Sequence, residues 1–176
     1  MDSREKLAAA LEQLLQYKSI DAVSVIEISS AAGVSRKTFY RCFRDKYDLV
    51  TWYFARFYEA SFGRIKEAVA WETAMLAHLD FYKAKHRVLK NAYTTHDING
   101  LRQFDVSITR RTYEIYLRQH GADLADEELQ FAIEFAARGG TDMVIEWLLS
   151  GMKLPPQRLV KLLKQTLPQK LLQYIG

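Results

Sequence analysis

Five basic side chains fall within twelve positions of this sequence, beside several hydroxyl-bearing residues. From residue 35 to residue 46 they are Arg36, Lys37, Arg41, Arg44 and Lys46, and Asp45 is the single acid. This segment accounts for the whole formal net charge of +4, because the rest of the chain has as many acidic as basic residues. Such a local positive charge indicates contact with a polyanion, with nucleic acid the first candidate, although a charged turn in water is the simpler alternative.

The residues around this segment predict two short helices joined by a glycine. Ser24 and Glu27 have the spacing of a capping box that begins one helix, and Gly33 ends it. Ser35 is the expected N-cap of the next helix, which runs to about Phe43. The small or apolar residues that can pack this pair together are Val25, Ile28, Ser29, Ala32, Val34, Phe39 and Phe43. The pattern is typical of a helix-turn-helix.

The outward side of the second helix is expected to contact double-stranded DNA. Arginine and lysine can donate to guanine, and a threonine methyl can pack on thymine. Hydroxyls and helix N-terminal amides contact phosphates. The predicted DNA-binding residues are Ser24, Ser35, Arg36, Lys37, Thr38, Tyr40, Arg41 and Lys46. In the alternative interpretation Tyr40 is a half-buried packing residue and Lys46 is a solvated neighbour of a helix cap.

The stretch SVIEISSAAGVSRKTFYRCFRDKYDLV, residues 24–50, resembles the DNA-binding domain of the tetracycline-repressor (TetR) family. The matching positions are Ser24, Ile28, Ser29, Ala32, Gly33, Val34, Ser35, Thr38, Phe39, Tyr40, Phe43, Lys46 and Leu49. The resemblance covers about the first 50 residues. It implies a homodimeric transcription factor whose variable helical C-terminal domain usually dimerises through its last two helices and often binds a small effector.

Two positions depart from the family pattern. Ser29 replaces the usual alanine, and Lys37 stands where many members have glycine, which adds a positive side chain to the side expected to face DNA. The segment RKTFYRCF and the short C-terminal domain are more similar to the subgroup that includes the activator of bacterial dihydroxyacetone kinase operons.

The remaining segments also predict helices, since apolar residues recur every three and four positions. We expect a first helix capped by Ser3, a fourth from Asp45 to about Phe62 with a continuation to Ala70 left open, and later helices over residues 71–92, 101–119 and 126–150. A last helix opens at Pro155 and Pro156 and kinks at Pro168. The predicted fold class is all-α. Residues 1–47 are expected to form the DNA-binding domain, and residues 48–176 a helical domain for dimerisation and effector binding.

Small residues four apart predict a close helix contact in the C-terminal domain. They leave one face of a helix nearly smooth, and a leucine stripe follows in the last helix. The predicted dimer interface is Ala132, Ala136, Gly140, Trp147, Leu159, Leu163 and Leu167. In the alternative, both stripes close the core of one subunit.

Aromatic residues crowd the fourth helix and its neighbours. The predicted effector pocket is Phe57, Tyr58, Phe81, Tyr82, Phe104 and Tyr113, although aromatics at helical spacing are more often core than pocket. In the alternative, the protein is a regulator or an interaction module whose C-terminal domain docks a coregulator protein instead of a small ligand.

The sequence offers little for catalysis or metal binding. His78 and His86 lack the i, i+4 spacing of zinc-binding helices, and the single cysteine, Cys42, excludes an internal disulfide or a thiolate-rich metal cage. We therefore expect no enzyme, no cofactor and no metal. Neither a long apolar run nor a signal-like N-terminus is present, so we expect no membrane partner and a cytoplasmic, nucleoid-associated location.

Overall fold

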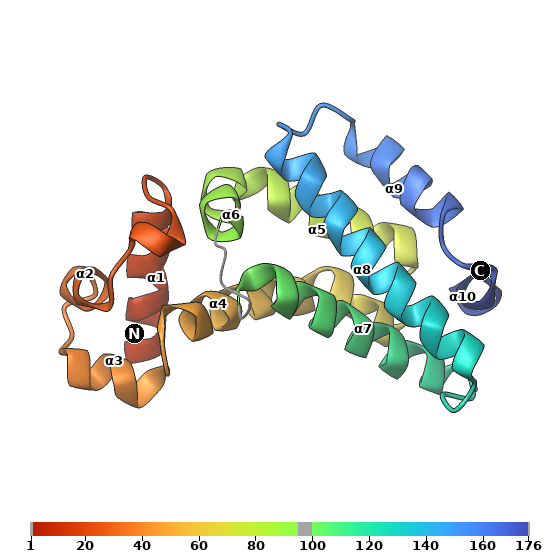
Figure 1. Ribbon diagram of the computed structural model, residues 1–176, viewed down its shortest axis with the longest axis horizontal. Coiled ribbons are helices and arrows are strands. Elements are labelled where there is room, and N and C mark those ends of the chain that lie inside the picture. Colours follow the sequence, from red (N-terminus) through yellow and green to blue (C-terminus); the bar gives the residue numbers. More distant parts are fainter. Residues whose placement is uncertain (1, 95–99, 176) are drawn as a thin grey trace. The chain divides into compact units, whose positions relative to one another are not determined.

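The computed structural model describes residues 2–94 and 100–175, and this part of the chain contains helices and no strand (Figure 1). The elements are α1 (Ser3–Leu15), η1 (Ile20–Ala22), α2 (Val25–Ala31), α3 (Arg36–Cys42), α4 (Lys46–Ala60), η2 (Phe62–Glu67), α5 (Trp71–Ala84), α6 (His86–Tyr93), α7 (Leu101–Gln119), α8 (Glu127–Leu149), α9 (Pro156–Gln165) and α10 (Gln169–Ile175). The all-α prediction is confirmed. None of the described helices combines the length and hydrophobicity needed to cross a membrane.

The chain forms two compact units. The first comprises residues 1–56 and 85–101, and the second comprises residues 57–84 and 102–176. The chain leaves the first unit within α4 and returns to it at the α5–α6 junction. This grouping by contact does not test the functional division at residue 47, which stays a prediction.

The first unit is built on α1, which packs against α2, α3 and α6. Leu7, Leu11 and Leu15 lie on one stripe of α1 and are fully buried. Ile28 from α2 and Phe39 from α3 complete this core with no exposed surface. Burial of each such side chain contributes about 1.5–3 kcal/mol, so the apolar spacing explains why three short helices hold together.

The first helix begins differently from the prediction. Ser3 is its first helical residue, and Asp2 occupies the N-cap position without a side-chain hydrogen bond. The predicted Ser3 cap is therefore wrong. Asp2 has an extended backbone, so the helix begins at Ser3, one residue earlier than a Ser3 cap implies.

The segment predicted as one helix over residues 71–92 forms two, so this prediction is wrong. Lys85 separates α5 from α6 with φ −110° and ψ 22°. Lys85 Nζ pairs with Glu12 of α1, and Asn91 Nδ2 donates to the backbone oxygen of Leu15 at 2.9 Å. Contacts between residues more than 70 positions apart thus outweigh a continuous local helical pattern.

The fourth helix ends at Ala60 and does not continue to Ala70. Ser61 leaves the helical region with φ −119° and ψ −101°, and Ala68 after η2 has a positive φ of 61°. Gly63 lies close to α4, because a Cβ there would stand 3.1 Å from the backbone oxygen of Tyr58. The close backbone approach accounts for glycine at this position.

The C-terminal segment breaks at Pro168, where the sequence predicted only a kink. Thr166 is the C-cap of α9, and its Oγ1 donates to the backbone oxygen of Leu162 at 3.1 Å. Pro168 has no N–H to continue the ladder, while its own carbonyl accepts from the Leu171 amide at 2.8 Å and so begins α10.

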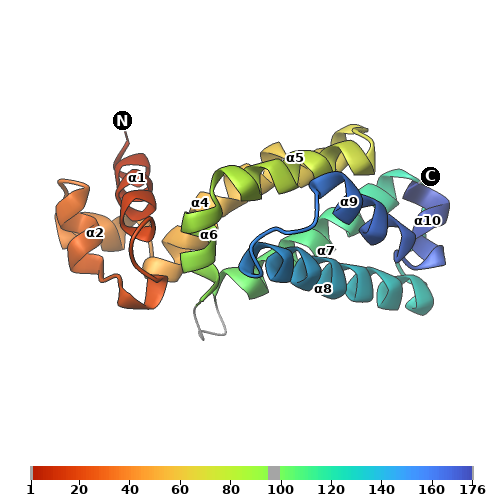
Figure 2. The ribbon, with the colours of Figure 1, turned by 90° about the horizontal axis from the view of Figure 1, so that it is seen from above.

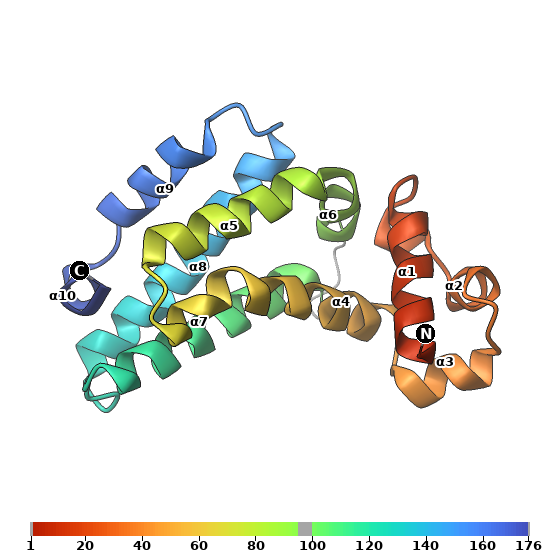
Figure 3. The ribbon, with the colours of Figure 1, turned by 180° about the vertical axis from the view of Figure 1, so that it is seen from behind.

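The second unit places α5 in contact with η2, α8 and α9, and α10 in contact with α8. Figure 3 shows α9 alongside α5, and Figure 2 shows α10 at the N-terminal end of α8. Lys170 of α10 pairs with Asp126 and Glu128, and Asp126 also caps α8 by accepting from the Glu128 amide at 2.9 Å. The start of α8 and the end of the chain are therefore held together by one ionic cluster.

We expect Ser29→Ala to stabilise the protein. Ser29 is 3% exposed, and its Oγ has no hydrogen-bond partner in the described part of the chain. A buried hydroxyl without a partner destabilises by about 1–3 kcal/mol, and alanine is also the better helix former. Urea denaturation should show a free energy of unfolding about 1 kcal/mol higher in the variant. Ser30→Ala, an exposed change on the same helix, is the matched control, and an equal gain there would contradict the assignment to burial.

Candidate nucleic-acid interface and cavity

The turn between α2 and α3 is a Schellman motif centred on Gly33. Gly33 has φ +63°, and its amide donates to the Ser30 carbonyl at 3.1 Å. The next amide, of Val34, donates to the Ser29 carbonyl at 3.0 Å. This pair of bonds ends a helix and requires a residue that tolerates positive φ. The predicted role of Gly33 is confirmed.

Both helices of the pair begin at the predicted serine caps. Ser24 Oγ accepts from the Glu27 amide at 3.2 Å, and Glu27 Oε2 accepts from the Ser24 amide at 2.9 Å, which completes the capping box. The Lys18 ammonium, with the backbone and hydroxyl of Ser24, lowers the pKa of Glu27 to about 2. Ser35 Oγ accepts from the Thr38 amide at 3.1 Å. Two serines of the predicted DNA-binding set, Ser24 and Ser35, therefore also cap the two helices.

The outer side of α3, which we define as Arg36, Lys37, Tyr40 and Arg41, is exposed. In the described ranges no ion pair involves Arg36, Lys37 or Arg41. The opposite side of the helix is buried, since Phe39 is 0% and Phe43 3% exposed. Thr38 is half-buried at the edge between the two sides. The helix thus presents three cations and a phenol that form no ion pair with the unit's own carboxylates.

Lys46 has an internal role that sequence reasoning missed. Its Nζ donates to the backbone oxygens of Asp21 at 3.0 Å and Val23 at 2.9 Å. Next to it, Tyr47 O–H donates to Asp21 Oδ1 at 2.9 Å. These bonds tie the start of α4 to the segment before α2, so a phosphate contact of Lys46 would use its remaining N–H. The sequence around Lys46 could not predict these hydrogen bonds, because their partners lie more than twenty positions away.

The second unit contains a cavity of about 480 Å³, which we call the aromatic cavity. Its lining comes from α4, η2, α5, α7, α8, α9 and the segments on either side of α9. Tyr58, Tyr82 and Tyr113 of the predicted pocket line it. Phe104 lines a second cavity of about 410 Å³, and Phe57 and Phe81 stack on each other with centroids 4.4 Å apart and line neither. The structure therefore brings together half of the predicted pocket residues.

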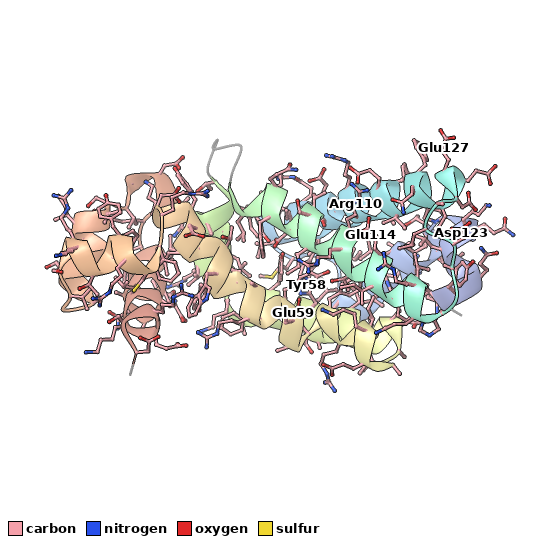
Figure 4. All side chains as sticks on the ribbon, turned by 90° about the horizontal axis from the view of Figure 1, so that it is seen from below. Tyr58, Glu59, Arg110, Glu114, Asp123 and Glu127 are labelled. Atoms are coloured by element: carbon pink, nitrogen blue, oxygen red, sulfur yellow. The ribbon has the colours of Figure 1, made fainter. Side chains whose placement is uncertain are left out.

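Tyrosine hydroxyls tie the walls of the aromatic cavity together. Tyr58 O–H donates to Thr109 Oγ1 at 3.2 Å, which joins the end of α4 to α7 (Figure 4). Trp71 Nε1 donates to Tyr113 Oη at 3.0 Å, and Tyr82 O–H donates to Asp105 Oδ2 at 3.2 Å. Burial raises the pKa of Tyr58 and of Tyr113, so both phenols stay protonated. On the outside of α7, Arg110 pairs with Glu114 and with Glu134 of α8 (Figure 4).

His78, Asp105 and Trp71 line the cavity although the sequence analysis did not assign them to it. The spacing of four, three and four residues places one set of side chains on the same face of α5: Trp71, Met75, His78 and Tyr82. This helical spacing could have indicated from the sequence that they line one site. His78 Nδ1 lies 3.1 Å from Ser61 Oγ, and burial lowers the pKa of the imidazole to about 4. It is therefore a neutral side chain at physiological pH.

The predicted dimer residues mostly face the inside of one subunit. Ala132, Ala136, Trp147, Leu159 and Leu163 are buried, and Gly140 and Leu167 are half-buried. All of them except Ala132 and Trp147 line the aromatic cavity. Their burial agrees with the alternative in which the stripes close the subunit core. Their part in a dimer stays a prediction.

A different face of α8 is exposed and apolar. Phe131, Phe135 and Met143 are 74%, 59% and 56% exposed, and exposed Gly139 completes a series with a spacing of four. We call these four residues the outer face of α8. It lies one residue before the predicted small-residue stripe, and its aromatic members were visible in the sequence at the same spacing.

Two protein-family models match the chain. The model described as "Bacterial regulatory proteins, tetR family" covers residues 7–51. The model described as "Transcriptional regulator C-terminal region" covers residues 70–169, which is more than half of the chain. The protein belongs to the TetR family of transcriptional regulators. The family resemblance noted in the sequence is confirmed.

Solved structures with this fold include an operon activator and two TetR-family regulators. The dihydroxyacetone kinase operon activator DhaS superposes with a TM-score of 0.66 at 17% identity, over 98% of this chain and 96% of that chain. The TetR-family repressor AlkX from Dietzia sp. strain DQ12-45-1b, implicated in biodegradation of n-alkanes, gives 0.58 at 20% identity over 98% and 97%. A TetR-family regulator from Streptomyces coelicolor gives 0.62 at 19% identity over 93% and 78%. A search of curated proteins found no match.

In the described ranges, no group of three or more His, Cys, Asp or Glu side chains is placed so that it could hold a metal ion. His78 pairs with Ser61 rather than with His86, which lies in the other unit.

His78 should make stability depend on pH. With a folded pKa near 4 and an unfolded value near 6.5, the imidazole is neutral in both states above pH 6.5 and contributes nothing there. As the pH falls through this window, only the unfolded chain takes up the proton, so stability is lost. Between pH 7.5 and 4.5 the loss from this residue should be about 2–3 kcal/mol.

Urea denaturation of the wild type and of His78→Phe at the two pH values measures this loss. The variant should lose less stability by that amount, whereas His120→Phe, at an exposed histidine, should behave like the wild type. Equal pH dependence in wild type and His78→Phe would rule out a lowered pKa of this imidazole in the folded state.

Proposed function

We propose that this TetR-family regulator binds a palindromic operator as a homodimer and that a small molecule in the aromatic cavity controls the binding. The observation that carries the DNA-binding part is the outer side of α3. Three cations and a phenol stand exposed on a helix whose other side is anchored by Phe39 and Phe43. A positively charged surface whose cations form no ion pair with carboxylates of the protein can bind phosphates and base edges.

In the proposed complex α3 lies in the major groove. Arg36, Lys37 and Arg41 donate to base edges or phosphates, and Tyr40 O–H donates to a phosphate. Two copies would place two such helices about one turn of DNA, roughly 34 Å, apart. The Schellman turn and the serine caps support this mechanism because they hold α3 in one orientation before DNA arrives.

The homodimer is supported by the outer face of α8. Phe131, Phe135 and Met143 expose apolar side chains that a second copy would bury. Gly139 adds an independent argument. Glycine in a helix costs up to about 1 kcal/mol relative to alanine, and a Cβ on Gly139 would meet nothing within 4 Å in this subunit. Close approach by a helix of a second copy would explain a glycine at this position, whereas no contact within the single subunit does.

Control by a small molecule is supported by the aromatic cavity, whose volume is in the range of ligand sites. Such a ligand changes operator affinity only by binding the DNA-bound and free states of the regulator with different affinities. A coupling of one to two kcal/mol corresponds to about a tenfold response.

Sequencing of genomic fragments captured by the purified protein tests the proposal. Enrichment of one or a few palindromic sites at near-physiological salt is the expected result. Uniform capture of DNA at all sequences would contradict an operator-specific function.

Lys37→Ala should change which operator is preferred. If Lys37 reads a base edge, its loss costs about 1–3 kcal/mol at one base pair and relaxes the preference there. Tyr40→Phe is the control of a different kind, because loss of a phosphate contact weakens all sequences alike. Binding to an operator panel by fluorescence anisotropy measures both. An unchanged ranking of operators in Lys37→Ala would remove its role as a base reader.

Phe131→Glu should weaken the dimer at least tenfold, because it places a charge in the apolar interface. Phe131 is chosen because it does not line the aromatic cavity. Sedimentation equilibrium measures the change, and Tyr17→Glu, at an exposed aromatic residue of the first unit, is the matched control. A dimer unaffected by Phe131→Glu would move the interface away from this face.

A further inference from the structure

The charges around the aromatic cavity argue against an anionic ligand. Within the described part of the chain, the charged residues lining it are Asp105 and Asp142, and neither lysine nor arginine is among them. Asp142 is exposed and pairs with Arg102. A carboxylate or phosphate entering the cavity would lose its hydration, gain no cation and meet the buried Asp105.

One hydrogen-bond acceptor of the cavity can be assigned from its neighbours. Ser61 Oγ donates its only hydrogen to the Phe57 carbonyl at 2.7 Å. It therefore accepts from His78 Nδ1, 3.1 Å away, and Nδ1 carries the imidazole hydrogen. This leaves the lone pair on His78 Nε2, for which the described residues offer no donor.

One donor can be assigned in the same way. Tyr113 Oη accepts from Trp71 Nε1 at 3.0 Å, and no described residue accepts the hydrogen of the Tyr113 hydroxyl. His78 and Tyr113 flank the same ring, because their ring centroids lie 6.3 and 5.7 Å from that of Phe62. His78 and Tyr113 thus both lie beside Phe62, which also lines the cavity.

The lining residues from α8 and α9 are mainly apolar. Phe135, Met143, Leu159, Leu162 and Leu163 offer hydrocarbon or thioether surface, and Thr141 and Asp142 of α8 are the polar exceptions. An occupant would therefore combine a small polar group with a larger apolar body.

The two polar groups also argue against a cationic polar group. An ammonium group could donate to His78 Nε2, but it has no lone pair to accept the hydrogen of the Tyr113 hydroxyl. A hydroxyl group can both donate to Nε2 and accept from Tyr113.

We propose that the aromatic cavity binds an uncharged, mainly apolar alcohol or phenol, whose hydroxyl donates to His78 Nε2 and accepts from Tyr113 O–H. The hydrocarbon part lies between α8 and α9. This inference rests on the proposed function, in which a small molecule occupies this cavity.

Isothermal titration calorimetry of the full chain at pH 7.4 tests the ligand class with three probes that share one alkyl chain: 1-decanol, decanoate and decylammonium. We expect 1-decanol to bind at least about tenfold more tightly than either charged probe. His78→Phe should weaken 1-decanol binding about tenfold through loss of the acceptor. His120→Phe makes the same substitution at an exposed histidine outside the cavity and should leave the affinity unchanged.

A blocking variant locates the binding. A Cβ on Gly140, which lines the cavity, meets nothing within 4 Å, so the side chain of Gly140→Leu enters open space and should abolish binding of 1-decanol. Binding that survives Gly140→Leu, or no binding of any probe, would overturn the proposal.

Tighter binding of decanoate or decylammonium, blocked by Gly140→Leu, would overturn the alcohol or phenol class and leave small-molecule control intact. Operator binding is measured separately, without ligand, by genomic enrichment. Failure of the DNA-binding function is therefore distinguishable from failure of the ligand assignment.

Discussion

Burial of Phe39 is the constraint on which the outer side of α3 depends. This ring has no exposed surface, and α3 contacts both α1 and α2. In a helix of seven residues, one fully buried position leaves little freedom of rotation about the axis. Arg36, Lys37, Tyr40 and Arg41 are exposed because Phe39 and Phe43 are not. The family assignment agrees with this arrangement, since the matched N-terminal region spans the whole helix pair.

In the second unit, adjacent residues of α8 lie on a buried face and on an exposed face of the helix. Ala132 and Ala136 face inward and let neighbouring elements approach, while Phe131 and Phe135 face outward. Gly139 continues the exposed face, and Gly140, which is half-buried, continues the inward face. The aromatic cavity and the proposed dimer surface therefore share one helix, and Phe135 and Met143 border both. A ligand in the aromatic cavity would therefore contact Phe135 and Met143 of the proposed interface directly.

Much of the fold was predictable because its signals are short. The capping box at Ser24 and Glu27, the turn at Gly33 and the cap at Ser35 join residues at most five positions apart. Helix breaks were less predictable. The pattern over residues 71–92 is helical throughout, yet the chain bends at Lys85 because Glu12 and Leu15 of α1 hold α6. At Pro168 the missing N–H was visible, but whether the chain kinked or broke depended on the Thr166 cap.

The sequence by itself determined the helical class, the helix-turn-helix, the basic outer side of α3 and the family, because periodicity, caps and local charge are properties of neighbouring residues. Tertiary structure alone decided which apolar stripe faces outward on α8, that Lys46 binds carbonyls of the segment before α2, and that Ser61 orients the imidazole of His78 in the aromatic cavity. These outcomes depend on residues 17 or more positions apart or on which side of a helix finds a neighbour, and helical spacing is the same for a stripe that is buried and for one that is exposed.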